Sequence, residues 1–172
     1  NGRIEVISIE PFITTINTSM GQPINSFYPK PYNNLGVPGA FVYDILNATN
    51  ANDCYTAKFA QSPNPLFDVI LRGNGSAFTQ AKSLHPTFLS LWIGNNDVLG
   101  FGTSGGTLPY TPIPNFTALY SQLIDSIKTL NVKVVVANIP DVSAIPFFTT
   151  VGDQLRAQGI STIWGTDYNN QV

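Results

Sequence analysis

Apolar residues follow a strand, helix, strand pattern between residues 87 and 139. Thr87 to Ile93 is almost continuously apolar, as is typical of a central strand in a parallel sheet. From about Phe116 to Leu130 apolar residues recur at helical spacing, and Val132 to Ile139 predicts a second strand that Pro140 stops. This order predicts a right-handed βαβ unit with parallel strands.

Weaker patterns predict shorter elements, which are helices over residues 40–46, about 76–84 and 151–158, and a strand over 161–164. The residues expected to face the core are Phe41, Ile45 and Leu46 of the first helix and Phe116, Leu119, Tyr120, Leu123, Ile124, Ile127 and Leu130 of the longest one. Ser76 and Asn115 are candidate N-caps, and Asn131 is a candidate C-cap. We expect residues 47–65 and the Gly- and Pro-rich residues 94–115 to be loops.

Residues 1–32 carry a less regular pattern. The β-branched residues from Ile4 to Ile9 are typical of a short strand. Four prolines interrupt the segment that follows, so we expect residues 1–32 to be mostly a long ordered loop.

The composition narrows the class of protein. Only 10% of the 172 residues are charged, against roughly 25% in a typical soluble domain. A surface made polar by neutral side chains favours a secreted, periplasmic or outer-membrane-attached bacterial protein. The net charge of −2 and the scattered basic residues argue against a nucleic-acid partner. The single cysteine, Cys54, is expected to be buried and cannot form an internal disulfide.

Two short segments carry candidate chemistry. Gly94-Asn95-Asn96-Asp97 follows a predicted strand, and an asparagine amide there can donate to a developing oxyanion or form a structural Asx turn. Gly36-Val37-Pro38-Gly39-Ala40 precedes a predicted helix, where it is either a plain turn or a means of presenting a bare backbone N–H.

In this order the two segments resemble two conserved blocks of the SGNH/GDSL hydrolases (lipases, esterases and acylhydrolases), and the similarity covers roughly residues 33–150. Gly39 matches the glycine of the second block, and Gly94 and Asn96 match those of the third. The resemblance implies an α/β, flavodoxin-like three-layer fold with a parallel sheet. It also implies a serine-dependent carboxylic ester hydrolase, in which Gly39 and Asn96 donate to the oxyanion and Asp97 braces the turn.

The chain departs from the family at both ends of this region. No Gly-Asp-Ser-Leu-like block lies in residues 1–32, and no Asp-x-x-His block follows residue 150. The only histidine, His85, precedes the third-block strand and is expected in a surface turn. We therefore expect residues 1–172 to be an interior part of a single SGNH-like domain. It would consist of a loop-rich excursion (1–32), the core blocks (33–150) and the start of a further segment (151–172).

On this hypothesis the catalytic Ser, Asp and His belong to remaining segments of a parent hydrolase. The substrate is a small ester, either a lipid or an acylated sugar, and no metal or organic cofactor is required. An alternative is a non-catalytic carbohydrate-binding protein on the same scaffold, using Tyr28, Tyr32, Trp92 and Phe101. A third is a hydrolase that uses Ser104 in Gly102-Thr103-Ser104-Gly105-Gly106, although a predicted loop precedes this motif where a nucleophile elbow needs a strand.

Overall fold

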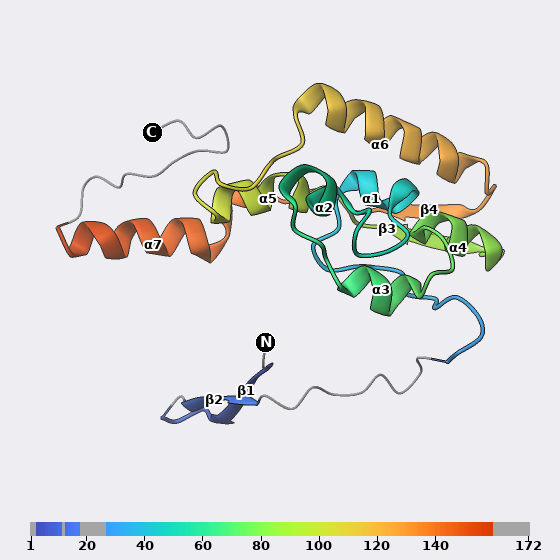
Figure 1. The fold of residues 1–172 in the computed structure, drawn as a ribbon. Helices are drawn as coiled ribbons and strands as arrows, with labels where there is room; N and C mark the ends of the chain where they lie inside the picture. Colours follow the sequence, from blue (N-terminus) through green and yellow to red (C-terminus); the bar gives the residue numbers. More distant parts are fainter. Residues whose placement is uncertain (1–2, 12, 18–26, 160–172) are drawn as a thin grey trace.

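The protein is a mixed α/β chain, and its computed structural model describes residues 3–11, 13–17 and 27–159 (Figure 1). The strands are β1 (Arg3–Ser8), β2 (Ile13–Asn17), β3 (Phe88–Leu91) and β4 (Lys133–Val136). The helices are α1 (Val42–Asn47), α2 (Tyr55–Ala60), α3 (Leu66–Leu71), α4 (Ala77–Ser83), α5 (Asn96–Thr103), α6 (Ile113–Lys128) and α7 (Pro146–Ala157), with a 3₁₀ turn, η1, at Val142–Ala144.

The strands β3 and β4 form a parallel pair, as the strand, helix, strand pattern predicts. Phe88 lies opposite Lys133 and Leu91 opposite Val136. Helices α5 and α6 connect the carboxyl end of β3 to the amino end of β4, and α6 runs back along the pair on the same side as α1 (Figure 1). In the described residues this sheet has two strands, so the α/β class is confirmed in its coarse form.

The hydrophobic core lies between this sheet, α1, α3, α4 and α6. Leu123 and Ile127 of α6 are buried, and the other predicted core residues from Phe41 to Ile124 are buried or pack against the core. Leu130 is an exception, because it lies beyond the end of α6, is half-buried and does not belong to the core cluster. Helix α3, for which the sequence suggested no element, contributes Phe67 and Leu71, which are among the most buried side chains. Cys54 is buried as expected.

Two segments predicted as loops contain helices. Within residues 47–65 lies α2, whose first N–H, that of Tyr55, donates to the Asp44 carboxylate at 2.6 Å. Within residues 94–115 lies α5, which forms in spite of Gly100 and Gly102. A Cβ at Gly102 would lie 2.7 Å from the Phe148 ring, so the glycine allows a close contact between α5 and the chain around α7. Both helices depend on contacts with distant residues, which local propensity does not register.

Most other differences concern the ends of elements. Helix α4 begins after Ser76, whose Oγ accepts a hydrogen bond from Thr79 N–H at 3.2 Å, so this predicted N-cap is confirmed. Helix α6 starts after Pro112, so Asn115 is not its N-cap, and its C-cap is Thr129 instead of Asn131. Helix α7 begins at Pro146, five residues before the predicted start, and the strand predicted over 161–164 lies outside the described residues.

The amino-terminal residues form a β-hairpin. The predicted strand near Ile4 is present as β1, and it pairs antiparallel with β2, placing Ile4 opposite Ile16. Our expectation that residues 1–32 are mostly loop is therefore wrong for β2, whose threonines and isoleucines have high β-propensity.

Candidate functional site

The two motifs of the sequence meet at the carboxyl end of β3. Gly94 follows this strand with φ +118°, which turns the chain into α5 and places Asn96 in the first turn of that helix. The Nδ2 group of Asn96 donates a hydrogen bond to the carbonyl oxygen of Ala40 at 2.9 Å. Since Gly39 directly precedes Ala40, the structure brings the two predicted oxyanion donors into one neighbourhood across 56 residues of sequence.

Gly39 presents its backbone to solvent. It has φ +80° and is exposed, and within the described residues its N–H has no hydrogen-bond acceptor. The neighbouring Asn64 side chain donates to the Pro38 carbonyl at 2.9 Å and would lie 3.3 Å from a Cβ at residue 39. A side chain here would be both conformationally strained and crowded, so the position requires glycine.

Two buried carboxylates fix the start of α1: Asp97 links it to α5, and Asp44 links it to α2. Asp97 accepts hydrogen bonds from the Val42 N–H at 3.0 Å and from the Thr111 hydroxyl at 2.7 Å. Asp44 accepts from the Phe41 N–H at 2.8 Å, in addition to the Tyr55 N–H. The predicted bracing role of Asp97 agrees with these contacts. We did not predict a role for Asp44, because the predicted helix starts at residue 40, whereas α1 starts at Val42 and so has Asp44 at its third position, where an acidic side chain can accept the N-cap N–H.

Burial makes these carboxylates unusually weak acids. Loss of hydration raises the pKa of Asp44 from its ordinary 3.8 to about 6, against the opposing effect of its two backbone hydrogen bonds. The negative charge of Asp97 adds to this increase. Burial also raises the pKa of Asp97 itself, while the bonds from Thr111 and Val42 act in the opposite direction.

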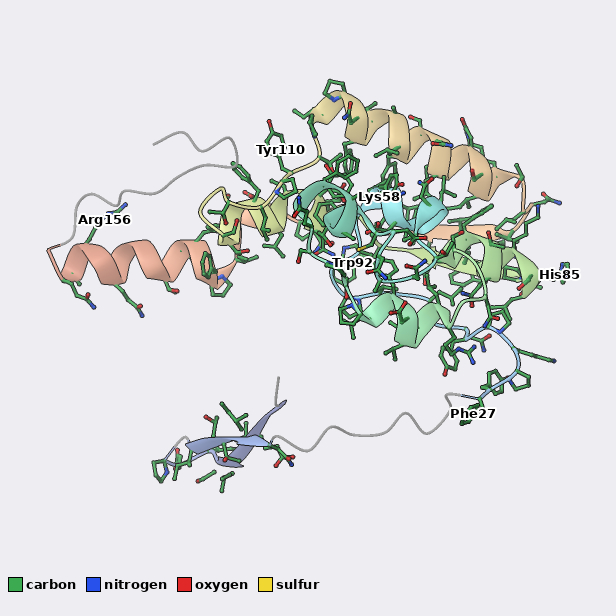
Figure 2. The ribbon with its side chains drawn as sticks, viewed as in Figure 1. Phe27, Lys58, His85, Trp92, Tyr110 and Arg156 are labelled. Carbon is green, nitrogen blue, oxygen red and sulfur yellow. The ribbon has the colours of Figure 1, made fainter. Side chains whose placement is uncertain are left out.

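The other candidate catalytic side chains lie elsewhere. His85 is exposed, follows α4 and precedes β3, so it sits at the amino end of the strand whose carboxyl end carries Asn96 (Figure 2). Ser104 follows a helix instead of a strand, and its Oγ donates to the Phe101 carbonyl at 3.2 Å and accepts from the Leu108 N–H at 3.0 Å. Ser104 therefore lacks the geometry of a nucleophile elbow.

The aromatic residues of the carbohydrate hypothesis lie in three different environments. Tyr28 and Tyr32 stack with centroids 6.1 Å apart, and the Arg72 guanidinium lies 4.0 Å from the centre of the Tyr32 ring. Trp92 is 67% exposed beside the end of β3. Phe101 packs edge-on against a different residue, Tyr110. The contacts between them do not define one shared sugar platform.

No protein-family model, curated protein or solved structure matches this chain. Among the helices of the described residues, none combines the length and the apolar character needed to cross a bilayer. The site geometry and the two sequence motifs are therefore the basis for assigning a function.

Proposed function

We propose that this chain provides the oxyanion-binding half of a serine-dependent carboxylic ester hydrolase of the SGNH/GDSL type. The backbone N–H of Gly39 and the side-chain amide of Asn96 are the two donors. The observation that carries the proposal is the 2.9 Å hydrogen bond from Asn96 to Ala40, because it holds the amide beside the loop that exposes Gly39.

The proposed chemistry follows from charge development in ester hydrolysis. Attack on the ester carbonyl makes its oxygen negative, and preorganised N–H donors stabilise that charge without reorganising. Asn96 is neutral and half-buried, and one of its two amide N–H groups is committed to Ala40. The second can reach a ligand oxygen. Asp97 and Asp44 maintain the relative position of the two donors by fixing the backbone between Phe41 and Val42.

The serine comes, in this proposal, from a further strand that extends the sheet to a flavodoxin-like three-layer fold. A groove of about 650 Å³ follows the edge of β3 and includes every residue from Phe88 to Trp92. Its opposite wall contains the loop at residues 33–36 and part of α4. In the described residues β3 pairs only with β4, and Val134, Val135 and Val136 are 37–56% exposed, whereas parallel sheets are normally covered on both faces.

A parallel strand in this groove would end at the same sheet edge as Gly94. The loop after such a strand would then carry a serine towards Gly39 and Asn96, since ligands of open α/β sheets bind at the carboxyl ends of the strands. The Asp-His pair also belongs to residues other than those described, because His85 lies at the opposite end of β3.

Turnover of p-nitrophenyl acetate and butyrate by the full natural polypeptide tests the proposal. Asn96→Ala should lower kcat by about 10²–10³-fold with a smaller change in KM, because one oxyanion donor is lost. Asn96→Asp keeps the shape and replaces the donor with an acceptor, so it should lower kcat at least as much. The matched control is Asn74→Ala, at an exposed asparagine between α3 and α4.

Circular dichroism of each variant separates loss of folding from loss of chemistry. A folded Asn96→Ala variant with wild-type kcat would overturn the assignment of Asn96. Labelling with a fluorophosphonate probe tests the reaction class. Covalent capture of a serine supports the hydrolase, and failure to label an active-site serine favours the carbohydrate-binding alternative.

A further inference from the structure

A second cavity, of about 270 Å³, lies between α1, α2 and the segment that leads into α6. Its walls include the rings of Tyr43, Tyr55 and Phe59 on one side and Tyr110 with Pro109 on the other. Figure 2 shows Tyr110 on the segment before α6 and Lys58, which neighbours Phe59, on α2. The cavity contains no residue of the sequence motifs, because its walls come from residues 43–59 and 109–119.

The cavity has an aromatic, largely apolar interior. The rings of Tyr55 and Phe59 have centroids 4.6 Å apart, and Tyr43 lies 6.1–6.3 Å from both. The hydroxyl of Tyr55 donates to the Tyr110 carbonyl at 3.2 Å, and the Lys58 ammonium donates to the Tyr43 hydroxyl at 2.6 Å. These polar groups are engaged with the protein, so the cavity presents mainly ring surfaces to an occupant.

Two rings at the cavity remain accessible. Phe59 is 53% exposed and Tyr110 is 43% exposed, although phenylalanine is a residue type that proteins usually bury. An accessible aromatic ring can pack offset or edge-on against another planar ring.

Hydrogen bonds of Thr111 link the cavity to the residue next to Asn96. Thr111 lines the cavity, and its hydroxyl and N–H bond Asp97 at 2.7 and 2.8 Å. Asp97 is the direct neighbour of Asn96. Helix α6 runs back along the strands and ends at the amino end of β4, so its first turns lie at the carboxyl edge of the sheet (Figure 1). These first turns include Asn115, which lines the cavity, and Gly94 follows β3 at the same edge.

We propose that this cavity binds an aromatic ring of the ester substrate, so that the substrate class is an ester of an aromatic carboxylic acid. The role of this cavity in catalysis rests on the proposed function. Binding of an aromatic ring in the cavity can be measured whether or not the protein is an esterase. An apolar cavity of about 150 Å³ holds one benzene molecule. The larger volume here accepts one to two fused rings with the attached carbonyl directed towards Asn96.

Binding of methyl 2-naphthoate to residues 1–172, measured by NMR titration, tests the proposal without any catalytic serine. Phe59→Ala should weaken binding about tenfold, because it removes an accessible ring wall. Phe59→Leu keeps apolar bulk without the ring and should also weaken binding severalfold. The matched control is Phe27→Ala, at a phenylalanine that is 97% exposed and lies away from Tyr110 and Lys58 (Figure 2).

Methyl octanoate and glucose pentaacetate serve as competing ligand classes. Preferential, Phe59-dependent binding of either one in place of the naphthoate would overturn the aromatic-acid assignment. Naphthoate binding that Phe59→Ala leaves unchanged would also overturn it. Phe59-dependent naphthoate binding, in a natural polypeptide that proves to have no esterase activity, would support the cavity while rejecting the proposed function.

Discussion

Replacing Asp44 by asparagine should remove a pH dependence of stability that its burial creates. The side chain of Asp44 is 1% exposed, and its two oxygens accept the N–H groups of Phe41 and Tyr55. Burial disfavours its charged form, so the pKa of this carboxyl is raised to about 6 in the folded chain, while the unfolded chain titrates near 3.8.

The sign and size of the effect follow from proton linkage. Between pH 3.8 and about 6 the folded chain holds more protons at Asp44 than the unfolded chain does. The free energy of unfolding must therefore fall as the pH rises through this window. A pKa displaced from 3.8 to about 6 corresponds to a total loss of about 3 kcal/mol, complete near pH 7. Asp97 contributes in the same direction, because its pKa is also raised.

Urea unfolding of the wild-type chain and of Asp44→Asn, at intervals from pH 3.5 to 7.5, measures this contribution directly. The difference between the two free energies of unfolding should change by about 3 kcal/mol across the range, with the wild type losing stability relative to the variant as the pH rises. Asp125→Asn is the matched control, at a side chain that is 72% exposed and paired with Lys128, and its curve should remain nearly parallel to that of the wild type. A difference between wild type and Asp44→Asn that stays flat, or rises with pH, would refute the reasoning.

Two further substitutions test the packing. Gly94→Ala forces a side chain into φ +118° and places its Cβ 2.5 Å from Ile139 Cδ1, so unfolding experiments should show a loss of about 1–3 kcal/mol. Ile139→Val should recover part of that loss by removing the clashing methyl group, and a complete lack of recovery would exclude the clash as a cause. Leu71→Ala in the core should cost about 2–5 kcal/mol, while Val69→Ala on the same helix, at a half-exposed position, should cost far less; similar losses would contradict the assigned core.

The regular elements with strong local patterns could be predicted from the sequence. The apolar stripe of α6 identified Leu123 and Ile127 as core residues, and the apolar run before Gly94 identified β3. The N-cap at Ser76 was also recognisable, because its hydrogen bond to Thr79 spans only three residues. Such features depend on neighbours within one or two turns of chain.

The candidate site could be predicted only in part. Gly39 and Asn96 were recognisable as motif positions, but their separation in space could not be predicted from the sequence. Helix α5 was missed because its two glycines lower helix propensity, and its first turn is held by the bonds of Asp97 to Val42 and Thr111. Asp44 and the aromatic cavity were missed because their contacts link residues that carry no shared pattern.

The sequence by itself determined the α/β class, the parallel order of β3 and β4, and the two motifs at residues 36–40 and 94–97. Local periodicity and capping suffice for these, since each residue's preference is expressed over a few neighbours. Only the tertiary structure decided that the Asn96 side chain donates a hydrogen bond to the Ala40 carbonyl, next to Gly39. The burial of both Asp44 and Asp97 also depends on the tertiary structure. It also decided that tyrosines from three segments line one cavity. These features depend on loop closure over many residues, which packing of the whole core determines and local sequence preference does not.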